Sequence, residues 1–139
     1  MLKTYLIIAI LSCLFGSCHP DMFYSWVTLK NNSTKGICYA YSNSFPDTSI
    51  PIGNYIPKGT PGPPSGVIQP GESYSLVKSG SLESYFTSAP SGTLELFIFD
   101  ANTVQTIAWD TVLSKYLILK RYDLTLDSIN KTGRIIDYP

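Results

Sequence analysis

Prolines concentrate near the middle of the chain and limit what it can fold into. Of the ten prolines, seven lie between Asn43 and Gly71. Because proline fixes φ and lacks a backbone N–H, this segment excludes an α-helix and a central strand. A polyproline-like strap over a sheet is the favoured interpretation of residues 43–71, and a functional loop is the alternative.

Strand patterns occur on both sides of this segment. Tyr24–Lys30 and Ile37–Ser42 are rich in aromatic and β-branched residues and flank a polar stretch, which predicts a hairpin. The sequence VIQPGESYSLV, residues 67–77, predicts a strand broken by a Pro-Gly turn. Thr93–Asp100 contains the apolar run LFIF, which predicts a central strand buried on both faces.

Short helical patterns appear after residue 80. Ser81 is placed to cap a short helix over SLESYF. Asn102 has Gln105 three residues later, an arrangement typical of a capping box. Apolar residues recur from Trp109 to Leu117 at helical spacing, which predicts a helix with one apolar face.

The C-terminal residues return to strand patterns. Successive side chains of Ile118–Asp123 are expected to alternate between the two faces of a strand. Thr125 can cap a last helical turn, which Gly133 can end. Residues 134–139 then supply a closing strand. This order of elements predicts a mainly β fold, a single-domain β-sandwich with short helical connections in its C-terminal half. A layered α+β sheet is the alternative.

The first seventeen residues have the features of a signal peptide. Lys3 precedes an apolar segment, Tyr5–Phe15, that contains no charged residue. As a helix this segment would extend roughly 16 Å, about half the thickness of a bilayer's hydrocarbon core. We therefore expect a cleaved leader and no permanent transmembrane helix.

Two small residues and a cysteine follow the apolar segment. Gly16, Ser17 and Cys18 resemble a bacterial lipobox, although Phe15 stands where an aliphatic residue is usual. The resemblance implies cleavage before Cys18 and attachment of a diacylglycerol to its sulfur, because the thiolate is the nucleophile that forms the thioether. Two or three acyl chains hold a protein firmly on a membrane. Lipidation at Cys13, a plain secreted protein and an uncleaved anchor are the alternatives.

These features divide the chain into a lipoprotein signal peptide at 1–17, a short membrane tether at 18–23 and one β-rich domain at 24–139. Five residues, His19 to Phe23, separate Cys18 from the first predicted strand and span at most roughly 18 Å. We therefore expect the domain to lie against a membrane of the bacterial cell envelope. The outer membrane is favoured, with either its periplasmic or its surface face.

Composition excludes several classes of function. Without residues 1–17 the chain has 122 residues with nine basic and ten acidic side chains, a balance that does not indicate a nucleic-acid partner. His19 is the only histidine and lies in the tether, which excludes a Ser/His/Asp triad and a histidine-based zinc site. Cys38 lies in an apolar strand and is expected to pack as a small hydrophobic residue. No disulfide and no cofactor are expected.

Carboxylates offer one remaining route to catalysis. A two-carboxylate hydrolase is formally possible, but no spacing singles out a pair. Asp100 and Asn102 match the start of a calcium loop, yet Val104 and Gln105 stand where that loop needs an oxygen ligand and a glycine. We therefore expect no metal site and no enzyme. The candidate carboxylates are Glu72, Glu83, Glu95, Asp100, Asp110, Asp123 and Asp127.

Two triplets resemble an O-glycosylation signal of some gut bacteria, in which aspartate precedes Ser or Thr and an aliphatic residue. They are Asp110–Val112 and Asp127–Ile129. Such triplets are short, and Thr111 and Ser128 also suit the first turn of a helix. The favoured interpretation of both is that the hydroxyl forms a hydrogen bond with the backbone at the start of a helix.

The C-terminal third carries a family resemblance. FIFDANTV, then WDTVLSKYLILKRYDLTL and a terminal YP, resemble the C-terminal half of a group of small lipoproteins of gut Gram-negative bacteria. The match covers about residues 97–139. It implies the envelope location and the single domain, and because no activity is established for that group it implies no mechanism. Its distinctive residues are Trp109, Tyr116, Arg121 and Tyr122, which we expect at packing positions.

These observations favour an envelope-anchored lipoprotein that acts as a non-catalytic protein-interaction or accessory module. The expected partners are the membrane, through the lipid, and an envelope protein. The alternative is a module that binds a glycan or small ligand through exposed aromatic side chains such as Tyr55, since aromatic faces stack on sugars.

Overall fold

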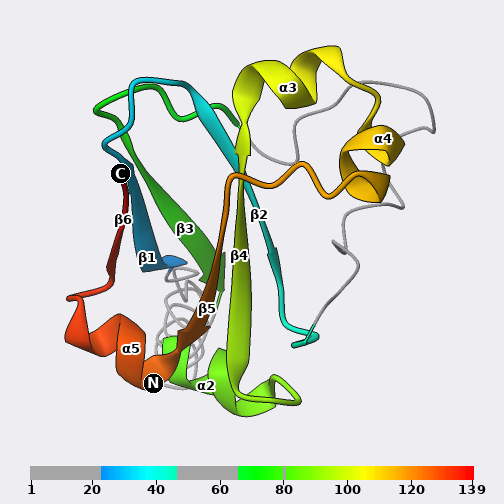
Figure 1. The fold of residues 1–139 in the computed structure, drawn as a ribbon. Helices are drawn as coiled ribbons and strands as arrows, with labels where there is room; N and C mark the ends of the chain where they lie inside the picture. Colours follow the sequence, from blue (N-terminus) through cyan, green and yellow to red (C-terminus); the bar gives the residue numbers. More distant parts are fainter. Residues whose placement is uncertain (1–22, 47–65, 80) are drawn as a thin grey trace, which may run out of the picture.

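The computed structural model describes residues 23–46, 66–79 and 81–139. Within these residues six strands form two three-stranded sheets, accompanied by four short helices (Figure 1). The strands are β1 (Phe23–Asn31), β2 (Ile37–Ser42), β3 (Ser73–Ser79), β4 (Thr93–Asp100), β5 (Lys120–Thr125) and β6 (Ile135–Tyr138). The helices are α2 (Leu82–Ser88), α3 (Ala101–Thr106), α4 (Trp109–Ser114) and α5 (Leu126–Lys131).

The two sheets differ in their pairing. In the first, with order β3-β1-β6, β1 pairs antiparallel with β3 and parallel with β6. In the second, with order β2-β4-β5, both neighbours of β4 are antiparallel to it. The central position predicted for Thr93–Asp100 is therefore confirmed.

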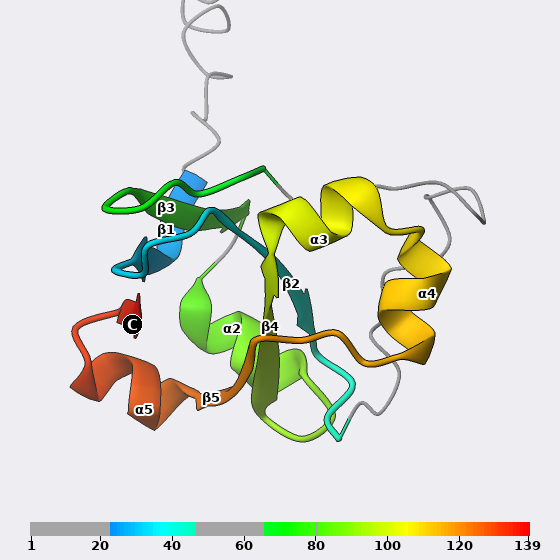
Figure 2. The ribbon, with the colours of Figure 1, turned by 45° about the horizontal axis from the view of Figure 1, so that its top comes forward.

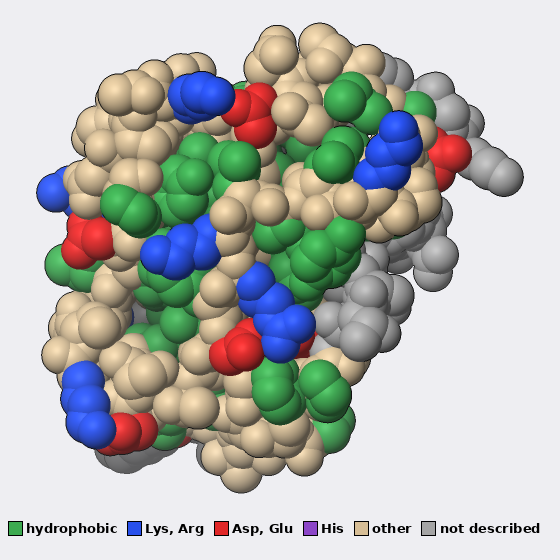
Figure 3. Space-filling model, viewed as in Figure 1, with side chains coloured by type: hydrophobic (Ala, Val, Ile, Leu, Met, Phe, Trp, Pro, Cys, Tyr) green, Lys and Arg blue, Asp and Glu red, His purple; other side chains and the backbone are tan. Residues whose placement is uncertain are grey.

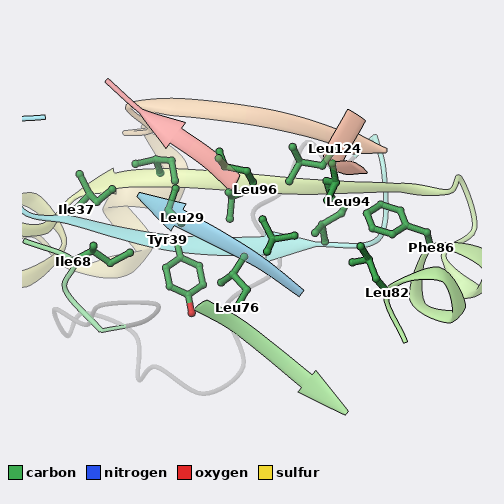
Figure 4. Packing of buried hydrophobic residues seen from close by; sticks show 14 residues of the cluster. Leu29, Ile37, Tyr39, Ile68, Leu76, Leu82, Phe86, Leu94, Leu96 and Leu124 are labelled. Carbon is green, nitrogen blue, oxygen red and sulfur yellow. The ribbon is translucent and has the colours of Figure 1, made fainter. Parts of the chain in front are cut away.

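One hydrophobic cluster fills the space between the two sheets (Figure 4). Leu29 of β1 and Leu96 of β4 meet there, and neither side chain has any exposed surface. Helices α2 and α5 add Phe86 and Ile129 to the same cluster. The sandwich part of the predicted fold is confirmed by this shared core.

A second cluster lies on the other face of the β2-β4-β5 sheet. Phe97 and Phe99 of β4 alternate with the residues of the first core and pack against Val104 of α3 and Trp109 of α4. The rings of Phe99 and Trp109 meet edge to face, with centroids 5.3 Å apart. The molecule therefore has three layers, two sheets and a pair of helices, which can be followed in the tilted view of Figure 2.

Local capping explains where α2 and α5 begin. The Ser81 hydroxyl accepts a hydrogen bond from the Ser84 backbone N–H at 3.0 Å. Thr125 and Ser128 form a capping box in which each side chain binds the other's backbone N–H. After α5 the chain turns through Gly133 at a φ of 64°, a conformation that glycine adopts without strain. These three predictions are confirmed.

The capping box predicted at Asn102 and Gln105 is wrong. α3 begins at Ala101, directly after the last residue of β4. The Asp100 carboxylate caps it by accepting a hydrogen bond from the Thr103 backbone N–H at 2.8 Å. The chain therefore passes from strand to helix at Asp100, two residues earlier than expected.

The predicted hairpin between β1 and β2 is also wrong, because these strands lie in different sheets. Leu29 of β1 and Ile37 of β2 belong to the same hydrophobic cluster and face each other across the core. The strands therefore meet through side chains, while their backbone partners come from distant parts of the chain. Residues 32–36 connect one sheet to the other.

The helical pattern from Trp109 to Leu117 is realised only in part. α4 ends at Ser114, and Tyr116 adopts a φ of 50°, which interrupts the helix. Trp109 is buried as a packing residue should be, whereas 48% of Tyr116 is exposed. The packing position expected for Tyr116 is therefore wrong.

Two leucine substitutions test the burial of β4 in the core between the two sheets. Leu96→Ala removes a fully buried side chain and should lower the free energy of unfolding by about 2–5 kcal/mol. Leu119→Ala is the matched control, because 48% of that residue is exposed, and it should change stability by less than about 1 kcal/mol. Urea denaturation measures both values, and similar losses for the two variants would contradict the assigned core.

Candidate functional site

The predicted leader and tether lie outside the described residues, so Cys13, Cys18 and His19 are not placed. The same is true of residues 47–65, which include Tyr55. Nowhere in the described ranges does a helix have the length and apolar character needed to span a membrane.

Cys38 is fully buried in β2 and has no disulfide partner among the described residues. Burial, and to a lesser degree the negative charge of Asp100, raises the pKa of its thiol to about 11. Because the thiolate is the reactive form, this cysteine is a poor nucleophile at neutral pH. The prediction that Cys38 packs as a small hydrophobic residue is confirmed.

The two glycosylation-like triplets fall at helix starts. The Ser128 hydroxyl donates to the Thr125 carbonyl at 2.8 Å and accepts from the Thr125 N–H at 2.9 Å. A sugar on Ser128 would remove the donated bond. Thr111 is the third residue of α4 and is half-buried, and that helix has no side-chain cap. The predicted hydrogen bonding at the start of a helix is therefore confirmed for Ser128. Modification of either triplet stays a prediction.

Three charged side chains gather on the face of the second sheet that also carries Phe97. The strand register places Glu95 opposite Asp123 and Phe97 opposite Arg121. Arg121 Nη2 lies 3.1 Å from Glu95 Oε1, and Arg121 Nε donates to Asp123 Oδ1 at 2.7 Å. The Glu95 side chain is fully buried, whereas that of Arg121 is 29% exposed.

The Arg121 guanidinium holds this ion cluster together. Both carboxylates face the same guanidinium, which offsets the cost of burying Glu95. Hydrogen bonds that the Arg121 guanidinium donates to the Asp123 carboxylate and to the Tyr116 hydroxyl raise the pKa of Arg121 above its ordinary value. The Phe45 ring lies 5.8 Å from the guanidinium carbon and covers part of it. Two of the candidate carboxylates, Glu95 and Asp123, therefore do come together, with the Arg121 guanidinium bound to both.

A groove separates the edge strands β5 and β6. It encloses about 480 Å³, with Leu124 and Ile136 among its buried lining residues and Ile135, 45% exposed, at its rim. The Tyr122 hydroxyl donates to the Asp137 carbonyl at 2.9 Å and links the two strands. Figure 3 shows hydrophobic side chains gathered between β6 and β5. This is an apolar surface at the open side of the sandwich.

The outer edge of β5 borders this groove, and no strand of the described residues pairs with it. Leu119, which precedes β5, is 48% exposed. On the groove side the Lys120 ammonium lies 4.8 Å from the centre of the Tyr122 ring, and Arg121 belongs to the ion cluster on the other face. Lys120 and Arg121 therefore point to opposite faces, as their adjacency on a strand predicts.

The exposed aromatic side chains of the described residues lie in two places. Tyr41 and Tyr74 come from the edge strands β2 and β3, where the Tyr74 ring stands 5.5 Å from that of Tyr39. Tyr116 lies beyond α4, beside Arg121. The exposed aromatic side chains that the structure describes are therefore divided between two separate regions of the domain.

Comparisons with protein families, with curated proteins and with solved structures find no match to this chain. The resemblance of residues 97–139 to small lipoproteins stays a prediction. Its distinctive residues are placed as follows: Trp109 in the second core, Arg121 in the ion cluster, and Tyr122 in the groove.

Removal of the arginine tests the ion cluster. Arg121→Ala takes away the cation nearest the buried Glu95 carboxylate and should lower the free energy of unfolding by about 3 kcal/mol. Asp123→Asn is the control, since that carboxylate is 45% exposed and its loss should cost less than about 1 kcal/mol. Urea denaturation at neutral pH compares them. If Arg121→Ala were no worse than Asp123→Asn, the stabilising role would be excluded.

Proposed function

We propose that the chain is an envelope-anchored lipoprotein whose domain acts as a non-catalytic protein-interaction or accessory module on the bacterial outer membrane. The observation that carries this proposal is the lipobox-like Gly16-Ser17-Cys18, followed after four residues by β1, which begins at Phe23. Acylation of Cys18 attaches the chain to lipid. So short a tether keeps the domain at the membrane surface.

The end of the domain nearest the membrane is the one at which β1 begins. Phe23 pairs with Ser79 at the end of β3, and α2 begins at Leu82. α2 therefore faces the bilayer side, and the groove between β5 and β6 lies along the flank of the domain. A partner in the same envelope layer has lateral access to this flank.

The partner is an extended segment of an envelope protein that pairs with the outer edge of β5. Main-chain hydrogen bonds to an unpartnered edge supply affinity, and side-chain pockets beside it supply specificity. The groove, with exposed Ile135 at its rim and Leu119 at the start of the edge, supplies such a pocket. The buried, poorly ionised thiol of Cys38 also favours a module without covalent chemistry.

Metabolic labelling with palmitate tests the anchor. The wild-type chain and Cys13→Ala should both incorporate label, because the thioether forms at Cys18. Cys18→Ala should incorporate none. Equal labelling of wild type and Cys18→Ala would refute the assignment, and loss of label only in Cys13→Ala would move the anchor to that residue.

A longer tether tests whether the domain works at the membrane surface. Insertion of about twenty Gly and Ser residues after Met22 gives the domain a flexible reach well beyond the natural tether. Crosslinking in intact cells should then recover less of the envelope partner. The same insertion after Pro139 is the control and should leave crosslinking unchanged. Equal recovery with both insertions would contradict the need for proximity.

A further inference from the structure

A polar pocket lies at the end of the sandwich opposite the start of β1. Its volume is about 440 Å³, which falls in the range of small-ligand sites. Three separate segments form it: the connection between β1 and β2, the residues that precede β3, and the start of α3. The polar lining side chains are Lys35, Gln69, Asp100, Asn102 and Gln105.

Asn31 holds two of these segments together. The residue is completely buried at the end of β1, and its side-chain amide donates to the Lys35 carbonyl at 2.7 Å and the Ile68 carbonyl at 2.9 Å. Its amide oxygen accepts from the Ser33 backbone N–H at 3.0 Å and the Ser33 hydroxyl at 2.7 Å. The walls of the pocket are therefore fixed before any ligand arrives.

Backbone hydrogen bonds attach the third segment. The Ala101 N–H donates to the Gly36 carbonyl at 3.0 Å, and Ile37 and Ile68 exchange two bonds of 3.0 and 2.8 Å. At Gly36 a Cβ would stand 3.2 Å from Val67 Cγ1. A side chain at position 36 would therefore require the Val67 side chain to shift by a few tenths of an ångström.

The polar groups of the pocket are available to a ligand. Within the part of the chain that the structure describes, the side-chain amides of Gln69, Asn102 and Gln105 make no hydrogen bond to the protein. Lys35 Nζ and Asp100 Oδ2 are 4.0 Å apart, a loose pair whose charges cancel. Side chains of Val67 and Ala101 add apolar surface between these groups.

We propose that this pocket binds a neutral saccharide. Amide side chains each donate and accept hydrogen bonds, as sugar hydroxyls do, so the two sets of groups match. Cancellation of the Lys35 and Asp100 charges disfavours an anion or a cation, and both side chains form charge-assisted bonds to hydroxyl groups. Val67 and Ala101 contact the C–H face of the ring.

The affinity of such a site is modest. Neutral hydrogen bonds exchanged with water contribute little each, and none of the lining residues that the structure describes carries an aromatic ring on which a sugar would stack. We therefore expect a dissociation constant on the order of 1 mM for a monosaccharide. A repeated glycan presents many copies of such a unit and would be retained by rebinding.

The orientation of the pocket, though not its chemistry, rests on the proposed lipid anchor. β1 has nine residues and carries the chain about 26 Å from Phe23 to Asn31. The pocket then opens away from the bilayer, at the far end from α2. A polymer in the aqueous layer of the envelope would reach it without contacting lipid.

Titration followed by nuclear magnetic resonance tests the proposal on the mature chain carrying Cys18→Ala. The probes are glucose, galactose, mannose and N-acetylglucosamine, each raised to about ten times the expected dissociation constant. At least one should produce saturable shifts of the side-chain amide signals of Gln69, Asn102 and Gln105. Absence of shifts at these residues with all four sugars would overturn the proposal.

Variants assign the shifts to the pocket. Asn102→Ala combined with Gln105→Ala removes two exposed amides and should weaken sugar binding at least about tenfold. Asn130→Ala, an exposed asparagine on α5, is the matched control and should leave binding unchanged. Equal weakening by both, or tighter binding of inorganic phosphate than of any sugar, would refute a neutral saccharide site. This titration does not depend on acylation, so its outcome is separate from that of the palmitate experiment.

Discussion

Burial of β4 on both faces is the constraint on which the rest of the structure depends. Leu96 packs between the two sheets while Phe97, the next residue, packs against the helices. A strand enclosed in this way must have a sheet on one side and a further layer on the other. The helical layer of α3 and α4, and the ion cluster around Glu95, both follow from that requirement.

The two ends of the sandwich have different character. Where β1 begins, α2 closes the first core with Phe86. Where β1 ends, the buried amide of Asn31 joins loop segments by four hydrogen bonds and leaves polar side chains around a pocket. If Cys18 is the lipid anchor, as proposed, the domain presents the second end to its surroundings. Attachment and the proposed saccharide site would then be separated by the length of one strand.

Features that depend on nearby residues were predictable from the sequence. Ser81 and Thr125 each cap a helix through a partner three residues away, so their patterns sufficed. Pairing between strands was not predictable. β1 pairs with β3 and β6, which come from distant parts of the chain, and the residue pattern of β1 would fit a hairpin with β2 equally well. The Glu95–Arg121 ion pair depends on the pairing of β4 with β5, and the pocket beside Asn31 depends on contacts between segments that are distant in the sequence. No spacing in the sequence identifies either.

The proposed function depends on Cys18 as the junction between protein and membrane. Mass spectrometry of the N-terminal peptide, from protein isolated in its native membrane, tests this most directly. We expect a chain that starts at Cys18 and carries the added mass of a diacylglycerol thioether. An unmodified cysteine at that position, or a peptide that still contains residues 1–17, would contradict it.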